Sequence, residues 1–204
     1  MKLTSKTIRK VRKRVKAIAF LLLLFMSFSA VAQKQSDKIN QYLHQLVNNH
    51  ELNPQDITGW KITSQHVSST SGVDHIYFRQ TYKGIEVNGA NASIHILPNG
   101  RILTKYNQFF KDLNTKISGP TTPVLSAIEA VEAVSKHLDY NLTEPISVVE
   151  NKGGIEQAAL LSNGGISLSN IPVKLMYQLA QNGQIVLTWD MSIEEISQQN
   201  WWNI

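Results

Sequence analysis

Residues 74–102 read DHIYFRQTYKGIEVNGANASIHILPNGRI, and apolar side chains alternate with polar ones along two parts of this stretch. Alternation with a period of two is typical of a strand with one buried face. We therefore predict strands over residues 75–82 and 90–97, joined by a loop over residues 83–89. Together these strands form an antiparallel hairpin.

The predicted register places Tyr82 opposite Ala90 and gives the hairpin one apolar face and one polar face. The apolar face contains Ile76, Phe78, Ala92, Ile94 and Ile96. The polar face contains His75, Tyr77, Arg79, Asn91, Ser93 and His95, with the two histidines as near neighbours. A slip of one residue would exchange the two faces, so the pattern specifies the register strongly.

Gln80 is the polar exception on the apolar face. A buried amide without hydrogen bonds costs on the order of 1–3 kcal/mol, so we expect the Gln80 side chain to pair with backbone groups. The loop over residues 83–89 is the expected partner. A direct contact between Gln80 and a partner protein is the alternative.

Further strands flank this hairpin. Residues 59–66 predict a strand before it, and the turn signal Pro98-Asn99-Gly100 predicts a strand over residues 101–108. An amphipathic helix is expected over residues 36–48, where five apolar residues form one stripe at helical spacing. These are Ile39, Tyr42, Leu43, Leu46 and Val47.

A second half begins after residues 116–123, KISGPTTP, where one Gly and two Pro interrupt regular structure. Ser126 and Glu129 have the spacing of a capping box, which predicts a helix that ends near Tyr140. Residues 173–180 and 185–192 then predict a hairpin. Its first strand has the alternating residues Val173, Leu175, Tyr177 and Leu179, and its second has Ile185, Leu187, Trp189 and Met191. Asn182-Gly183 favours a two-residue type I′ turn between them.

The amino-terminal 32 residues have the three parts of a secretory signal peptide. Eight Lys and Arg residues precede the uninterrupted apolar run of residues 17–26, and Ala30 and Ala32 are the small residues of a cleavage site before Gln33. The sequence thus predicts an extracellular protein that meets a membrane only through this peptide, during export. Residues 33–204 retain 12 Lys and Arg against 15 Asp and Glu, a net charge of about −3 instead of the +5 of the whole chain. The basic pI gives no support to nucleic-acid binding, and we expect no nucleic-acid partner.

No catalytic constellation is found in the sequence. His50-Glu51 begins the H-E-x-x-H pattern of zinc peptidases, but position 54 is Pro, so the second ligand is missing. The chain has no Cys, which excludes a cysteine nucleophile and a disulfide framework. We expect no metal or other cofactor on this chain.

Residues 74–87, DHIYFRQTYKGIEV, resemble the fungalysin/thermolysin propeptide motif, which has His and Gln on one strand, an aromatic, a Gly turn and a Val. The continuation through Asn88-Gly89-Ala90 and His95 to the Asn99-Gly100-Arg101 turn is also similar. The matching residues are His75, Gln80, Tyr82, Gly84, Val87, His95 and Gly100. The second half resembles the PepSY-like region that follows this motif.

The resemblance implies an α+β fold of two small cystatin-like units, each with a helix and an antiparallel sheet. We assign residues 1–32 to a signal peptide, 33–118 to a fungalysin/thermolysin propeptide (FTP) domain, and 119–204 to a PepSY-like domain that is truncated at its C-terminal end. The extended β arrangement looks more like the fungalysin branch than the thermolysin branch.

The implied function is that of the N-terminal prosegment of a secreted zinc metallopeptidase. Such a prosegment assists folding of its own catalytic domain, its partner in cis, and inhibits it until cleavage. No enzymatic activity is expected of this chain, and zinc belongs to the missing catalytic domain. A free-standing secreted inhibitory or binding module that acts in trans is the alternative. The aromatic run Trp201-Trp202 is expected to be either an edge strand or the point where a longer chain continues, and the latter is favoured.

Overall fold

The computed structural model describes residues 35–204, so the predicted signal peptide and its cleavage site at Ala30, Ala32 and Gln33 lie outside the described residues. The chain forms two compact units, the first ending at Asn49 and the second spanning His50–Ile204. In the first unit, residues 35–48 are helical. Four members of the predicted apolar stripe are buried, namely Ile39, Tyr42, Leu43 and Leu46. No helix within residues 35–204 is long and apolar enough to cross a membrane.

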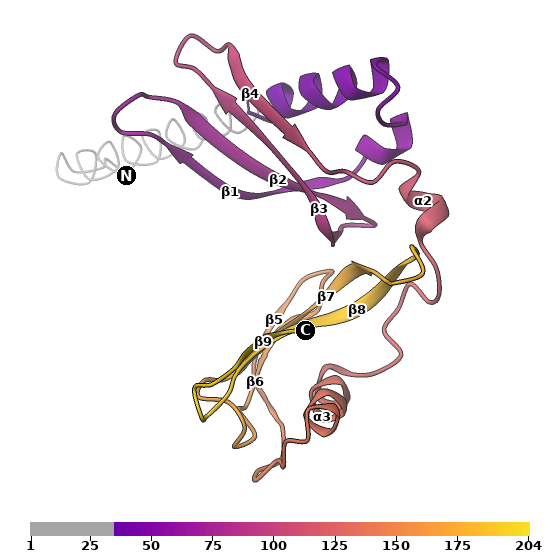
Figure 1. Ribbon diagram of the computed structural model, residues 1–204, viewed down its shortest axis with the longest axis vertical. Helices are drawn as coiled ribbons and strands as arrows, with labels where there is room; N and C mark the ends of the chain where they lie inside the picture. Colours follow the sequence, from indigo (N-terminus) through magenta and orange to yellow (C-terminus); the bar gives the residue numbers. More distant parts are fainter. Residues whose placement is uncertain (1–34) are drawn as a thin grey trace, which may run out of the picture. The chain divides into compact units, whose positions relative to one another are not determined.

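The second unit contains two antiparallel meanders, which follow one another along the chain (Figure 1). The first begins after the short 3₁₀ helix η1, Pro54–Ile57. Its strands are β1 (Trp60–Val67), β2 (Asp74–Tyr82), β3 (Ile85–Ile96) and β4 (Ile102–Asn107), each paired with the next.

The β2–β3 hairpin has the predicted faces but a different register. Phe78 pairs with Ala92, whereas Tyr82 pairs with Ile85 and not with Ala90. The strands come together earlier than expected because Lys83 and Gly84 both have positive φ, 48° and 84°, which closes a two-residue turn. An irregularity between Arg79 and Thr81 separates the pairs next to the turn from the central pairs of the hairpin. The central pairs are offset from the predicted register by two residues, an even number, so the buried face is unchanged.

The second meander follows two helices, α2 (Leu113–Lys116) and α3 (Ala127–His137). Its strands are β5 (Val148–Gly153), β6 (Ala158–Leu161), β7 (Ile171–Leu179), β8 (Ile185–Glu194) and β9 (Trp201–Asn203). The Ser126–Glu129 capping box predicted for α3 is present. Ala130 and Val131 of α3 pack in one apolar cluster with residues of β6, β7 and β8.

The predicted β7–β8 hairpin is present, and its strands pair from Val173–Met191 to Leu179–Ile185. Its turn differs from the prediction. The Ala180 amide donates to the Gln184 carbonyl, which leaves three residues in the loop, and Gly183 has positive φ whereas Asn182 does not. This is a three-residue hairpin with glycine in the left-handed position, not a type I′ turn.

The two meanders join through β3 and β7. Near its start β3 also contacts β7, where Val87 pairs with Tyr177 in parallel orientation. An apolar cluster surrounds this pair and includes Ile85, Leu113 and Ile185. The described fold is therefore mixed α+β, mostly sheet with few helices, as the sequence predicts at the level of fold class.

Candidate functional site

The seven residues that carry the propeptide resemblance lie on β2, on β3 and in the turns of the first meander. They fall into three groups. Gln80 is buried under the sheet, His75 and His95 meet on the opposite face, and the others shape the turns and the junction with β7. Gly100 lies in the β3–β4 turn with φ of 82°, and its amide donates to the Leu97 carbonyl at 2.8 Å.

Gln80 forms the centre of a buried polar network. Its Nε2 donates to the Asp56 carbonyl at 2.9 Å and to the Phe110 carbonyl at 3.1 Å, and its Oε1 accepts from the Phe110 amide at 2.9 Å. The side chain is fully buried. The expectation that Gln80 pairs with backbone groups is confirmed, but the expected partner, the loop over residues 83–89, is wrong.

Asp56 extends this network from η1. Its carboxylate accepts from the backbone amides of Asn53 at 2.8 Å, Asp112 at 3.0 Å and Leu113 at 3.0 Å. Charge-assisted hydrogen bonds of this kind are stronger than bonds between neutral groups. Gln80 and Asp56 thereby fix the segment before β1 to the segment after β4.

Three histidines form a row across β1, β2 and β3 on the other face of the sheet. His66 pairs with His75 and His75 with His95, and the ring centroids of each pair are 4.7 Å apart. The Nδ1 atoms of His75 and His95 are 2.7 Å apart, a hydrogen bond in which one ring donates and the other accepts. Burial first, and then the charges of His75 and His66, lower the pKa of His95.

This histidine row confirms the predicted proximity of His75 and His95 and adds His66, which the sequence reading did not place there. Tyr77 lies beside it, 5.8 Å from the His95 ring and 6.2 Å from the His66 ring. Among residues 35–204, no group of three or more His, Cys, Asp and Glu side chains is arranged to hold a metal ion. The row is thus a set of stacked and edge-on aromatic rings in which burial lowers the pKa of His95.

Tyr82, Gly84 and Val87 lie where the first meander meets the second. The Tyr82 ring stands edge-on to the Tyr177 ring at 5.3 Å. Val87 is fully buried beside the same tyrosine. A Cβ atom at Gly84 would meet the Ile155 side chain at 3.3 Å, so this turn lies against the β5–β6 connection.

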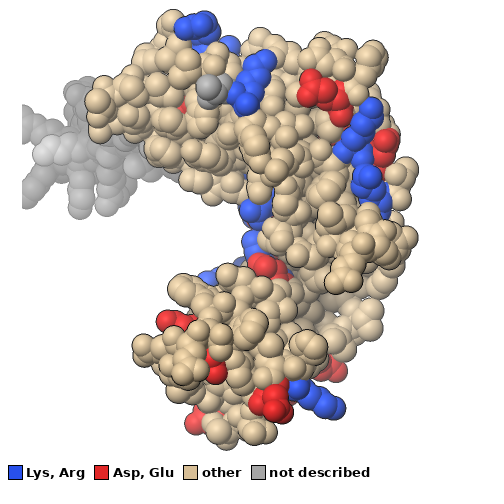
Figure 2. Space-filling model, viewed as in Figure 1, with Lys and Arg blue, Asp and Glu red and all other residues tan. Residues whose placement is uncertain are grey.

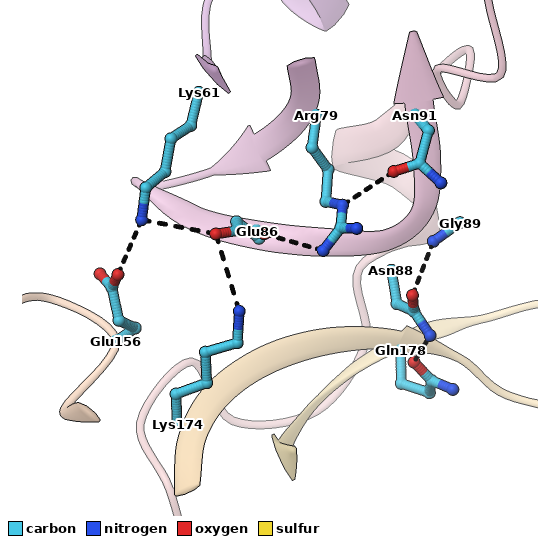
Figure 3. Close-up of polar contacts among 9 residues, drawn as sticks. All are labelled: Lys61, Arg79, Glu86, Asn88, Gly89, Asn91, Glu156, Lys174 and Gln178. Carbon is cyan, nitrogen blue, oxygen red and sulfur yellow. Dashed lines mark hydrogen bonds and ion pairs between the residues drawn. The ribbon is translucent and has the colours of Figure 1, made fainter. Parts of the chain in front are cut away.

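Glu86 is the charged centre of the junction (Figure 3). Its carboxylate pairs with Arg79 at 2.8 Å, with Lys61 at 3.4 Å and with Lys174 of β7 at 3.7 Å. Lys61 also reaches Glu156 in the second meander at 2.9 Å. That hydrogen bond is the main reason why the pKa of Lys61 is raised and that of Glu156 is lowered.

A second polar link lies next to this cluster. The Asn88 Nδ2 donates to the Gln178 Oε1 at 2.8 Å, between β3 and β7 (Figure 3). Over the face of the molecule in Figure 2, the basic and acidic residues of the described part are interspersed, without a large area of one sign. The ion pairs of Glu86 and Glu156 are therefore single contacts between opposite charges and do not belong to a large charged area.

The sequence analysis did not identify several of these residues. Asp56 follows Asn53-Pro54, a recognisable cap signal, but its carboxylate acts on residues more than 50 positions away. Glu86 lies within the motif stretch, yet its partners on β1 and β7 depend on long-range pairing. No local pattern encodes such contacts.

The stretch that forms β1 to β4 corresponds to a known family motif. Residues 58–109 match the Fungalysin/Thermolysin Propeptide Motif. This range includes every residue of the resemblance as well as His66, Arg79 and Glu86. It ends just before Phe110, whose backbone pairs with Gln80.

The chain is also similar to several fungal proteins. It is 25% identical over 150 residues to extracellular metalloproteinase 5 of Arthroderma otae, 26% over 147 residues to extracellular metalloproteinase 10 of Uncinocarpus reesii, and 26% over 144 residues to extracellular metalloproteinase 1 of Arthroderma benhamiae. Each comparison covers 70% of this chain and 22% of the relative. The chain therefore spans about a fifth of the length of these relatives.

Proposed function

We propose that residues 33–204 are the N-terminal prosegment of a secreted zinc metallopeptidase precursor, which helps its catalytic domain to fold and inhibits it until cleavage. The observation that carries this proposal is the match of residues 58–109 to the propeptide motif, over the whole β1–β4 meander. The similarity to extracellular metalloproteinases supports it, as these relatives extend far beyond the matched part.

The proposed partner is the catalytic domain of the same precursor, and the proposed zinc ion belongs to that domain. The described residues of this chain offer no ligand group for it. A prosegment on the same chain as its target acts at high effective concentration, so modest intrinsic affinity is enough to block a cleft. Cleavage of the connection removes this advantage and releases the enzyme.

We further propose the division into a signal peptide (residues 1–32), an FTP domain (33–118) and a PepSY-like domain (119–204), with export out of the cell through the signal peptide. The helix-then-meander order of α3 and β5–β9 supports a cystatin-like second unit. The propeptide-motif residues His75, Gln80, Tyr82, Gly84, Val87, His95 and Gly100 are proposed to build the framework that presents the inhibitory surface.

Expression of the cognate precursor with and without residues 33–204 tests this function. Deletion is expected to abolish most of the active peptidase, and coexpression of residues 33–204 as a separate chain is expected to restore part of it. Equal yields of active enzyme with and without these residues would contradict the proposal.

The alternative is a free-standing secreted module that inhibits a peptidase in trans. The coding sequence downstream of Ile204 separates the two. Several hundred further codons that include H-E-x-x-H support the prosegment, whereas an in-frame stop codon supports the free-standing module.

A further inference from the structure

The connection between the two meanders, residues 118–126, has no regular secondary structure. It is held at its ends, where the Ser118 amide donates to the Ile185 carbonyl at 2.9 Å and the Trp189 Nε1 donates to the Leu125 carbonyl at 2.9 Å. Between these two anchors, residues 119–124 make no backbone–backbone hydrogen bond with any other residue of the described range.

Apolar side chains on this connection face solvent. Val124 is 82% exposed and Leu125 is 44% exposed. The same residues border two hollows, one of about 310 Å³ against α3, β7 and β8, and one of about 460 Å³ beside the β5–β6 connection. The backbone at Val124 is thus approachable from both sides.

We propose that the two peptide bonds that flank Val124 are an internal processing site, cut by an endopeptidase that accepts a bulky apolar side chain directly after the scissile bond. Peptidase clefts of this kind hold an extended segment through its backbone N–H and C=O groups, by the same physics as strand addition. Residues 119–124 have their backbone C=O groups available, and all of them except Pro120 and Pro123 also have an available N–H. Val124 or Leu125 supplies the apolar side chain. In the cut, water adds across one peptide bond, giving a carboxylate on one residue and a new amino terminus on the next.

Two other exposed apolar residues lie in connections that are closed by a turn. Ile155 is in the β5–β6 connection, where the Gln157 amide bonds to the Gly154 carbonyl. Ile196 is in the β8–β9 connection, where the Gln198 amide bonds to the Glu195 carbonyl. These closed turns must open before a cleft can accept them as an extended strand, which is not required at Val124.

A cut at Val124 changes how the two meanders are held together. The uncut chain keeps β3 and β7 paired within one molecule, whereas the cut chain holds them only through non-covalent contacts, among them the Val87–Tyr177 pair, the Glu86 cluster and the surrounding apolar side chains. Loss of a short tether removes an effective concentration on the order of millimolar. Within the proposed function, this cut therefore weakens the prosegment as a unit and favours its clearance.

Limited digestion of the exported chain with thermolysin, which cuts before bulky apolar residues, tests the site. The first new amino terminus is expected at Val124 or Leu125. The double variant Val124→Asp, Leu125→Asp is expected to lose this cut at least tenfold in rate, whereas the control Ile196→Asp retains it. A first cut elsewhere, or equal rates for the double variant and the control, would overturn the proposal.

The cut chain provides the second readout. Its unfolding midpoint is expected to fall on dilution, because its halves separate, whereas the midpoint of the intact chain does not depend on concentration. A midpoint independent of concentration after complete cutting would contradict the proposed effect on the junction. The digestion uses an added peptidase, so its failure would not contradict the proposed prosegment function. That function is tested separately, by whether the chain inhibits the cognate peptidase.

Discussion

Gln80 connects three segments that are far apart in the chain through one side-chain amide. It joins β2 to the Asp56 carbonyl of η1 and to both backbone groups of Phe110 after β4. Because the amide is fully buried, water cannot replace these bonds when it is removed. Gln80 is therefore a structural clamp of the first meander.

We predict that Gln80→Ala lowers the free energy of unfolding by about 2–3 kcal/mol, because it leaves buried backbone groups of Asp56 and Phe110 without partners. Urea denaturation of the exported chain measures this loss. Gln65→Ala is the matched control, since Gln65 lies exposed on β1, and its cost is expected to be within about 0.5 kcal/mol. If both variants lose the same free energy of unfolding, Gln80 does not stabilise the first meander in this way.

The sequence identified Gln80 as unusual but not its partners. Its position on the apolar face follows from strand alternation alone, so its burial was predictable. The identity of Asp56 and Phe110 depends on how the segments before β1 and after β4 pass over the sheet, which alternation does not encode. The same holds for His66, since its place beside His75 depends on the β1–β2 register.

From the histidine row we predict that a fall in pH lowers the free energy of unfolding of the first meander. The folded-state pKa of His95 is lowered below its ordinary value, so below about pH 6.5 the unfolded chain binds more protons than the folded chain. Stability is therefore complete above the unfolded-state pKa and decreases as the pH falls from there through the lower folded-state pKa.

Unfolding midpoints measured between pH 8 and pH 5 test this prediction. We expect His95→Gln to reduce the decrease, because it removes the group with the lowered pKa. His44→Gln, which replaces an exposed histidine of the amino-terminal helix, is the control and is expected to leave the decrease unchanged. A His95→Gln profile identical to that of the parent chain would exclude the histidine row as the cause.

At the scale of elements, the β2–β3 turn serves two purposes. Lys83 and Gly84 close the hairpin with positive φ, and the turn lies against Ile155 of the second meander. A residue with a Cβ atom at Gly84 therefore meets both backbone strain and a crowded neighbour. Gly100 in the β3–β4 turn has a similar φ of 82°, but a Cβ atom there would have no neighbour within 4 Å among the described residues.

We predict that Gly84→Val destabilises the chain by more than Gly100→Val. Both substitutions force a β-branched residue into the left-handed region, at a cost of about 1–2 kcal/mol, and only Gly84→Val also displaces Ile155. Chemical denaturation of both variants provides the comparison. The proposal that this turn supports the meander junction fails if Gly100→Val is equally or more destabilising.

The alternation of apolar and polar residues predicted strands more accurately than it predicted the turns between them. The β7–β8 hairpin was predicted from eight alternating residues, whereas its three-residue turn was not, since Asn-Gly occurs in turns of both lengths. β5 and β6 were not predicted. β5 is largely polar and exposed, so its pairing with β6 leaves no alternation in the sequence.

For the whole molecule, the β3–β7 junction combines two sequence halves into one unit. Its parallel pair, its charge cluster and its apolar residues come from segments about 90 positions apart. No sequence pattern predicted this contact, because each half reads as a separate helix-and-sheet unit. The propeptide motif, in contrast, was recognisable from the sequence and is supported by the family match to residues 58–109.

Inhibition of the mature cognate peptidase by the separately added exported chain tests the central claim most directly. We predict dose-dependent inhibition that is weaker than in the uncut precursor, since the separate chain lacks the effective concentration of a tether. The control is the chain with Gln80→Ala, which is expected to inhibit less because its first meander is less stable. Full peptidase activity at saturating amounts of the folded parent chain would contradict the assignment of this chain as an inhibitory prosegment.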